Sequence, residues 1–184
     1  MSHGHRSHDD RLLDALSAID GVPFDGPMWR VVSTGRSVFD GSRGAGRWNP
    51  SDLSVLYGAQ EADGAMAEVY FHITLGQPVF PSRIQHDIFE LKAETRETLV
   101  FANMDDLERL NVDTLRYSDL TYTRTQEIGS AAAFMGFDGI IAPSARWDCQ
   151  NIVFFLNNID PDKLTEISQT RINWDDWRAR HRTG

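Results

Sequence analysis

The sequence predicts a single α+β domain with mixed, mostly antiparallel sheets and flanking helices. Segments typical of strands outnumber those typical of helices, and the two kinds do not alternate regularly, which argues against a parallel doubly wound sheet. A length of 184 residues is usual for one domain, and no shift in composition divides the chain. We therefore expect one domain over residues 11–184, preceded by a disordered, histidine-containing tail at residues 1–10.

Local patterns place the elements of this domain. Apolar residues with a spacing of three or four, and suitable capping residues, predict helices at 11–19, 60–73 and 125–135, a short helix starting near Asn103 and an amphipathic segment at 174–182. Short apolar or alternating runs predict strands at 28–32, 55–57, 86–93, 97–102, 137–142 and 151–156, and a further short element starts at 163–166. The glycine-rich segment 33–47 must be loop, 78–81 marks a break, and 113–123 is polar and irregular.

Charge and composition exclude several classes of function. A net charge of −9, from 27 acidic and 18 basic residues, disfavours non-specific binding to nucleic acid. An anionic substrate would need a local basic pocket within this acidic chain. A single cysteine allows no intrachain disulfide, no apolar run is long enough to span a membrane, and the N-terminus lacks the apolar region of a signal peptide. We expect a cytoplasmic protein.

A glycine-rich loop with two arginines is the densest chemical signal. Gly44 and Gly46 allow the backbone to approach a ligand closely, and Arg43 and Arg47 can contact phosphate or carboxylate groups. Trp48 offers either core mass or a stacking surface. The alternative is a tight loop with solvated arginines, because this segment is neither a Walker loop nor GxGxxG.

Three further side chains stand out. Glu68 lies in the small and apolar stretch AMAEVY, so its carboxylate is either solvated at the helix edge or held in a cleft. Arg30 is a charge in the middle of an apolar strand and must reach an edge, a partner or a ligand. Ser144 follows a buried-looking strand and either caps a turn or belongs to a binding loop.

Other enzyme templates fit poorly. The chain has no GxSxG, HExxH or CxxC motif. His72, His86 and His181 lack the spacing of metal ligands, so we expect no metal site and a structural or exposed role for each. Cys149 has no local signature of a nucleophile.

The order of several motifs resembles the RES domain, a family named after Arg, Glu and Ser residues. It comprises the toxins of RES–Xre toxin–antitoxin pairs. The resemblance covers about residues 28–160, and the portion from GRWNP to Glu68 is the most specific. The motifs are Trp29-Arg30, GAGRWNP (44–50), LYGA (56–59), AMAEV (65–69), GFDGIIAPSA (136–145) and NIVFF (151–155).

The resemblance implies an ADP-ribosyltransferase-like fold and an enzyme that consumes NAD⁺ as a substrate, without a true cofactor. Carried over position by position, the catalytic set is Glu68, Arg47 and Arg30, and the NAD-binding set is Arg30, Arg43, Arg47, Tyr57 and Ser144. Cleavage of the N-glycosidic bond builds positive charge on the ribose, which the carboxylate of Glu68 can stabilise. The arginines suit the pyrophosphate, Tyr57 suits stacking on nicotinamide, and Ser144 suits a hydrogen bond to the amide or ribose.

Three functions remain open from the sequence. The first is release of ADP-ribose to water or phosphate, which depletes NAD⁺ and arrests growth. The second is transfer of ADP-ribose to a cellular protein, such as an enzyme of nucleotide biosynthesis, and the third is a non-catalytic binding module. The intact Arg–Tyr–Glu–Ser set argues against the third. The family further implies an Xre-type antitoxin as partner, an oligomer formed with it and DNA contact through the antitoxin only.

Overall fold

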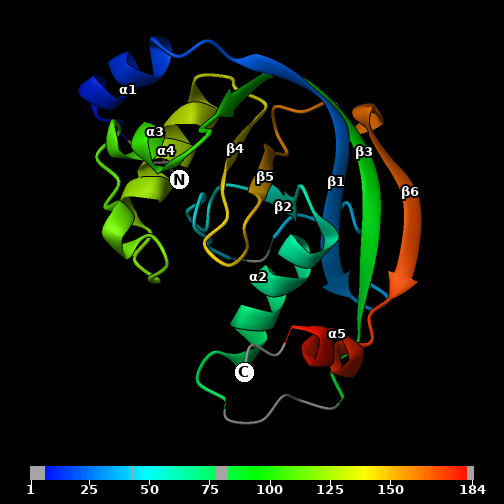
Figure 1. The fold of residues 1–184 in the computed structure, drawn as a ribbon. Coiled ribbons are helices and arrows are strands. Elements are labelled where there is room, and N and C mark those ends of the chain that lie inside the picture. Colours follow the sequence, from blue (N-terminus) through cyan, green and yellow to red (C-terminus); the bar gives the residue numbers. More distant parts are fainter. Residues whose placement is uncertain (1–6, 43, 78–82, 182–184) are drawn as a thin grey trace, which may run out of the picture.

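The structure of the protein is a computed structural model that describes residues 7–42, 44–77 and 83–181 (Figure 1). The strands are β1 (Val22–Ser33), β2 (Val55–Ala59), β3 (His86–Val100), β4 (Gly139–Pro143), β5 (Gln150–Phe155) and β6 (Leu164–Arg171). The helices are α1 (Asp10–Ser17), α2 (Ala62–Thr74), α3 (Met104–Glu108), α4 (Thr123–Phe134) and α5 (Trp174–Arg180), with 3₁₀ turns at Thr114–Arg116 and Pro161–Lys163.

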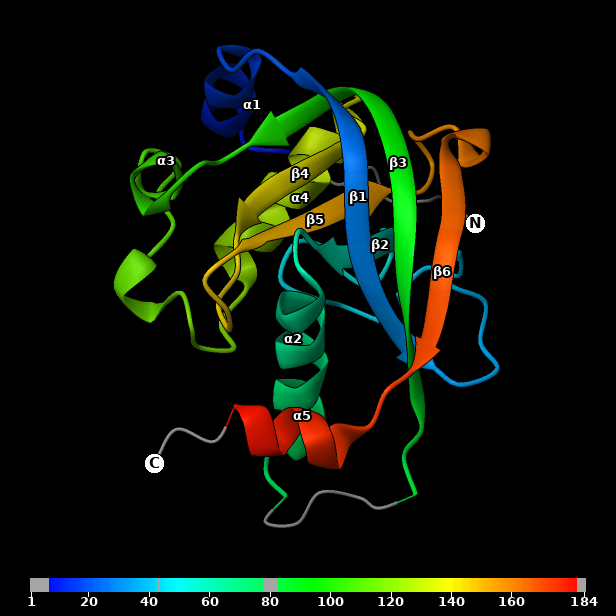
Figure 2. The same cartoon turned by 45° about the vertical axis from the view of Figure 1, so that its right-hand side comes forward.

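The strands form one strongly curved sheet in the order β1-β2-β5-β4-β3-β6. β1 also pairs with β3 over most of its length, so the sheet folds back on itself. In Figure 2, the long strands β1, β3 and β6 run side by side, and β4, β5 and β2 cross behind them at a steep angle. The pairings are antiparallel except that of β3 with β4, which is parallel. The predicted α+β class with mostly antiparallel pairing is confirmed.

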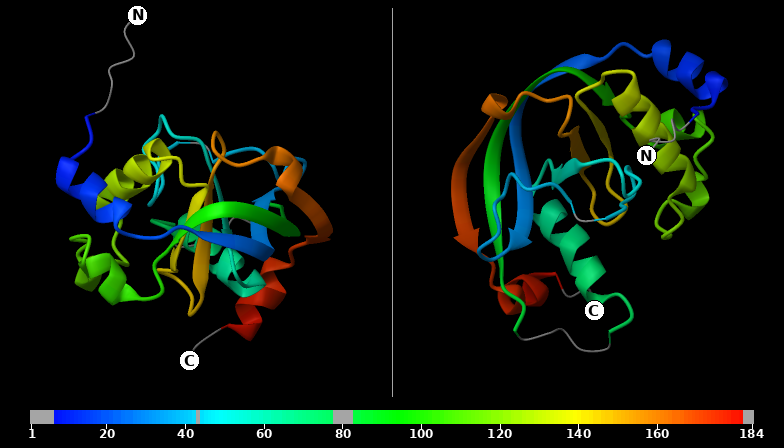
Figure 3. Two further views of the ribbon diagram at one scale, coloured as in Figure 1. Left: turned by 90° about the horizontal axis from the view of Figure 1, so that it is seen from above. Right: turned by 180° about the vertical axis from the view of Figure 1, so that it is seen from behind.

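The helices cover different parts of this sheet. α2 lies against the crossing strands, and α5 runs across the end of α2 (Figure 2). α1, α3 and α4 gather at the other end of the molecule, so that α1 and α5 lie far apart (Figure 3). None of the helices in the described ranges is long and apolar enough to cross a membrane.

Three clusters of buried side chains hold the layers together. The largest packs α1 and α4 onto β4 and β5 through residues such as Leu16, Ile128 and Val153. A second fills the curve between β1, β3 and β5, and a third packs α5 against α2 with Trp174 and Trp177. Burial of this apolar area is the main favourable term in folding. The third cluster matters for function, because it fixes the helix that carries Glu68.

The structure extends or corrects several predicted elements. The two strands predicted at 86–93 and 97–102 are one strand, β3, because the backbone of the polar residues between them still pairs with β1, as in Asp25 with Glu94. β6 is almost wholly exposed, so its sequence lacks the alternation that marks a half-buried strand. Asp9 caps α1 inside the predicted tail. The rest of that tail up to residue 6, and the predicted break at 78–81, lie outside the described residues.

Candidate active site

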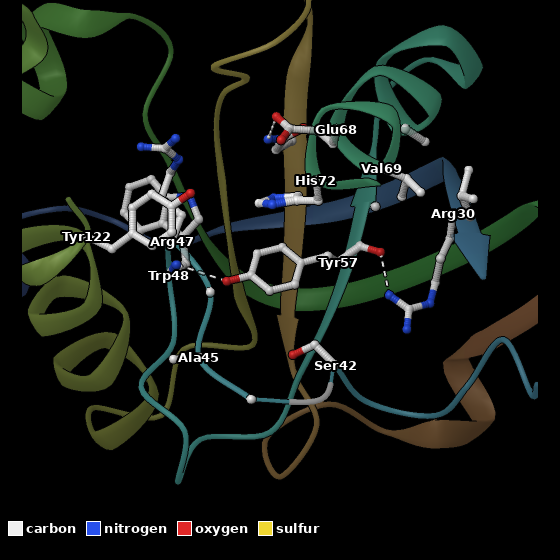
Figure 4. A pocket seen from close by; sticks show the side chains of 16 residues that line it. Arg30, Ser42, Ala45, Arg47, Trp48, Tyr57, Glu68, Val69, His72 and Tyr122 are labelled. Atoms are coloured by element: carbon white, nitrogen blue, oxygen red, sulfur yellow. Dashed lines mark hydrogen bonds between the residues drawn. The ribbon is translucent and has the colours of Figure 1, made fainter. Parts of the chain in front are cut away.

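A cavity of about 340 Å³ lies between residues 42 and 44–48 of the glycine-rich segment, β2 and α2 (Figure 4). Its volume is at the lower end of the range typical of small-molecule sites, roughly 300–1,000 Å³. Four of the predicted site residues line it, namely Arg30, Arg47, Tyr57 and Glu68. The sequence therefore predicted a set of residues that the fold brings together, although they lie on four different segments.

Glu68 is held in this cavity by two hydrogen bonds to one oxygen. The Ser144 hydroxyl donates to its Oε1 at 2.6 Å, and the Asn151 amide donates to the same atom at 2.8 Å. Among the described residues, none donates to Oε2. The carboxylate is thus fixed in place, yet one of its oxygens remains available to a ligand. This excludes the alternative of a freely solvated side chain.

The local sequence explains how α2 reaches this position. Gly64, Ala65 and Ala67 are small and buried, which lets the helix approach its neighbours closely. A Cβ at Gly64 would overlap the sulfur of Cys149, so the helix lies directly on the loop between β4 and β5. Because that loop follows Ser144, the close approach also brings the Ser144 hydroxyl to Glu68.

Ser144 and Asn151 play distinct parts. The Ser144 hydroxyl also accepts hydrogen bonds from the backbone N–H groups of Arg146 and Trp147, at 3.1 and 3.2 Å. The turn-capping reading of its sequence position is confirmed, and the same hydroxyl contacts Glu68, whereas a role in ligand binding stays a prediction. Asn151 was not predicted. Its signal is a polar side chain at the start of the apolar run NIVFFL, where burial demands a partner.

Arg47 is fixed between two aromatic rings. The centre of its guanidinium lies 4.5 Å from the ring centroid of Tyr117 and 4.6 Å from that of Tyr122, and its Nη1 donates to the Tyr117 carbonyl at 2.6 Å. Cation–π contacts of this kind are individually worth about 0.5–2 kcal/mol. They hold a positive charge beside the cavity without neutralising it. This is the local basic group that an anionic substrate requires in an acidic protein.

Arg30 borders the cavity, but its side chain donates its hydrogen bonds to backbone carbonyl groups. Its Nε donates to the Val38 carbonyl at 3.0 Å, Nη1 to Tyr57 at 2.6 Å and Nη2 to Asp40 at 2.7 Å. Burial, together with the charge of Arg36, lowers the pKa of Arg30 to about 10, and it stays charged near neutral pH. Of the alternatives open for this mid-strand charge, the structure shows a partner within the chain. The hydrogen bonds of Arg30 connect the first part of the glycine-rich loop to β2.

Tyr57 shapes the same loop through its hydroxyl. It donates to Asn49 Oδ1 at 2.8 Å and accepts from the backbone N–H of Trp48 at 2.9 Å. Burial raises the pKa of Tyr57 well above its usual range, so the hydroxyl keeps its proton. A Cβ at Gly46 would lie 2.6 Å from this hydroxyl, which explains the glycine. Trp48 is 1% exposed and packs on Phe101, and it is core rather than a stacking surface.

His72 also lines the cavity, one helical turn beyond Glu68. The sequence predicted a structural or an exposed position for His72, and the structure has its side chain exposed at the rim of the cavity. Partial burial lowers the pKa of His72 below its ordinary value. Glu68 opposes this, and Arg146 and Arg47 add to it. The signal that sequence reasoning passed over is the spacing of four residues from Glu68.

The remaining predictions concern cysteine, metal and Arg43. Burial and the charge of Glu61 raise the pKa of the Cys149 thiol to about 11, which leaves little thiolate near neutral pH. Within the described part of the chain, no three His, Cys, Asp or Glu side chains gather in a way that could hold a metal ion. Arg43 lies outside the described residues, and its role stays a prediction.

No curated protein sequence matches the chain. The fold is similar to that of a chain in the crystal structure of the M. tuberculosis MbcT–MbcA toxin–antitoxin complex, with a TM-score of 0.82 and 17% identity, covering 93% of this chain and 97% of that chain. At this identity the similarity shows the fold. The family model of the RES domain matches residues 27–175, which is most of the chain, and the protein therefore belongs to the RES domain family.

Proposed function

We propose that the chain is the toxin of a toxin–antitoxin pair and cleaves the nicotinamide–ribose bond of NAD⁺, passing ADP-ribose to water or phosphate. The observation that carries this proposal is the arrangement of Glu68. Its Oε1 is held by Ser144 and Asn151, and its other oxygen is left to a ligand in the cavity. A fixed carboxylate with one available oxygen is what stabilisation of a developing ribosyl cation requires.

The chemistry of the bond agrees with this assignment. Cleavage proceeds through a transition state with oxocarbenium character, so positive charge grows on the ribose ring. A carboxylate that is already oriented stabilises that charge without reorganising during the reaction. The leaving nicotinamide is neutral, so the reaction needs no strong general acid.

The same proposal assigns binding or supporting roles to the other residues of the site. Arg47 lies beside the cavity with its charge unpaired by any acid among the described residues, and it would bind the pyrophosphate. The ring of Tyr57 would stack on the cationic nicotinamide, and Ser144 would serve mainly by orienting Glu68. Arg30 borders the cavity. We assign it mainly to support of the glycine-rich loop, and contact with the ribose or phosphate would be secondary.

Incubation of the purified protein with NAD⁺ tests this function. The label is ³²P in the ADP-ribose portion, and free nicotinamide, ADP-ribose and ADP-ribose phosphate are measured with and without phosphate. Free labelled products in the absence of other proteins support the proposal. A labelled protein band that appears only when lysate is added would favour transfer to a protein, the second function left open by the sequence. Stable NAD⁺ in all reactions would contradict both.

The antitoxin belongs to the same proposal. The similar fold comes from a toxin–antitoxin complex, and the resemblance implies an Xre-type protein as partner, in an oligomer with this chain. Such a partner should stop nicotinamide release when it is added at equimolar concentration. Unchanged release from a complex shown to have formed would contradict this part.

A further inference from the structure

We propose that His72 is the general base that removes a proton from the water that accepts ADP-ribose. The proposal rests on the proposed cleavage of NAD⁺ and adds the residue that selects and activates the acceptor. Three features of His72 support it. The residue lies next to Glu68, it stands at the rim of the cavity, and its ring has no hydrogen-bond partner among the described residues.

His72 lies next to Glu68 on α2. His72 follows Glu68 by four residues on α2, so the two side chains lie on the same face of the helix, with Cβ atoms about 5–6 Å apart. Figure 4 shows the imidazole of His72 between Glu68 and Tyr57, directed into the cavity. A group that reacts next to the Glu68 carboxylate therefore has the imidazole as its neighbour.

The rim position suits an acceptor rather than the substrate. Glu68 is anchored by two residues that are largely buried, Ser144 and Asn151, whereas His72 is only partly buried and has one side open to solvent. On this proposal, water reaches the ribose from the side of His72. The imidazole makes no hydrogen bond to any described residue, so a ring nitrogen is available to accept a proton.

The surroundings of His72 favour the neutral imidazole, which is the form that can accept a proton. Glu68 lies on its own helix, Arg47 comes from the glycine-rich loop, and Arg146 comes from the loop between β4 and β5, where it stacks on Phe71. Partial burial, to which the two arginines add, outweighs the carboxylate and holds the pKa of His72 below its usual value. The imidazole is therefore mostly neutral at neutral pH.

The bond between ribose C1′ and the nicotinamide nitrogen breaks, and its electron pair stays on nicotinamide. The water oxygen forms the new bond to C1′, and one proton of that water passes to the free ring nitrogen of His72, which later releases it to solvent. The products are ADP-ribose, nicotinamide and one proton.

An anionic nucleophile provides the test, because it needs no base. In phosphate-free buffer, His72→Gln and His72→Ala should hydrolyse NAD⁺ about 100-fold more slowly than wild type, with little change in KM. Sodium azide should restore nicotinamide release by His72→Ala, with ADP-ribosyl azide as the product. His8→Gln, which makes the same change away from the cavity, should retain wild-type activity.

The pH profile adds a second readout. Wild-type hydrolysis should fall as pH drops through the lowered pKa of His72, because imidazolium cannot accept a proton, whereas the azide reaction of His72→Ala should lack this decline.

The outcomes separate the two proposals. A folded His72→Ala that hydrolyses NAD⁺ at the wild-type rate would overturn the role of His72 alone, as would a loss that azide does not restore. Absence of nicotinamide release by wild type would overturn the proposed function, and the role of His72 with it.

Discussion

Two side chains from neighbouring strands determine where the carboxylate of Glu68 points. Ser144 directly follows β4 and Asn151 lies at the start of β5, and both donate to the same oxygen. Hydrogen bonds to a charged group contribute about 1.5–3 kcal/mol each. At the scale of the residue, this pair converts an otherwise rotatable side chain into a fixed one.

Asn151→Ala should lower kcat for NAD⁺ cleavage about tenfold, because loss of one charged hydrogen bond lets Glu68 leave its position. KM should change less. Asn158→Ala is the matched control: its amide donates to the carbonyls of Ala133 and Phe137, outside the cavity. It should reduce stability and leave kcat unchanged. An unchanged kcat in Asn151→Ala would contradict the orienting role.

The substitution Arg30→Lys distinguishes two possible roles of Arg30, support of the glycine-rich loop and contact with the substrate. A lysine ammonium cannot reach all three carbonyls that the guanidinium holds, so the free energy of unfolding should fall by about 3 kcal/mol in urea titrations. Arg96→Lys, at a side chain that is 88% exposed, should change it little. Loss of activity with wild-type stability would show instead that Arg30 acts on the substrate.

Single residues could be predicted where their type conflicted with their surroundings. Glu68 in a small apolar stretch and Arg30 in an apolar strand were both singled out for this reason, and both line the cavity. Asn151 and His72 were passed over. An asparagine at a strand end and a histidine on a helix are common in ordinary structural roles, and their importance appears only when the partner, Glu68, is placed next to them.

At the scale of elements, α4 holds the glycine-rich loop against the cavity. Gly129 on α4 meets the backbone of Trp48, and a Cβ there would overlap the Trp48 carbonyl oxygen. The side chain of Gln126, one turn earlier, donates to the Gly46 carbonyl at 2.8 Å. The loop therefore owes its shape to a helix that lies about 80 residues further along the chain.

Gly129→Ala should destabilise the protein by about 2 kcal/mol and reduce NAD⁺ cleavage, because the helix must move away from the loop. In an unconstrained helix the same change would stabilise by about 1 kcal/mol. Thermal melting and nicotinamide release measure the two effects, with Ser130→Ala on the same helix as the control. A Gly129→Ala variant more stable than wild type would rule out the close contact.

A buried carboxylate on β3 adds side-chain hydrogen bonds to its backbone pairing with β6. Asp87 accepts hydrogen bonds from Arg171 at 2.6 Å and Gln169 at 3.0 Å. Burial raises the pKa of Asp87, but these hydrogen bonds outweigh it, so the pKa in the folded protein lies below the ordinary 3.8. The ionised form therefore stabilises the fold above the unfolded pKa, and this contribution disappears as pH falls through the folded pKa.

Asp87→Asn should consequently lower the free energy of unfolding by about 1 kcal/mol at pH 7, a modest value because Arg171 is half exposed. The difference from wild type should shrink as pH falls below about 4. Urea titrations at pH 7 and pH 3 provide the comparison. A difference that grew at low pH would contradict the assigned direction of the pKa change.

At the scale of the whole molecule, the folded-back sheet brings distant segments to one cavity. Local periodicity predicted α1, α2, α4 and the apolar strands, because one buried face leaves a regular pattern in the sequence. It could not predict the parallel pairing of β3 with β4 or the attachment of exposed β6, because these depend on contacts between residues far apart in the chain. The hydrogen bond between Ser144 and Glu68 also joins residues far apart in the chain, and only the resemblance to the RES domain had placed the two in one site.

The acidic balance of the chain also acts at this scale. A net charge of −9 repels an anionic substrate at long range, so the charge of Arg47, held between Tyr117 and Tyr122, has to act locally at the cavity. The same acidity is compatible with a basic surface on an antitoxin.

Glu68→Gln tests most directly whether the fixed carboxylate of Glu68 stabilises the ribosyl cation during the proposed cleavage of NAD⁺. The glutamine oxygen can still accept from Ser144 and Asn151, so the fold should persist while the negative charge is lost. Nicotinamide release should fall at least about 100-fold, with the melting temperature nearly unchanged. A folded Glu68→Gln variant that releases nicotinamide at the wild-type rate would contradict the account.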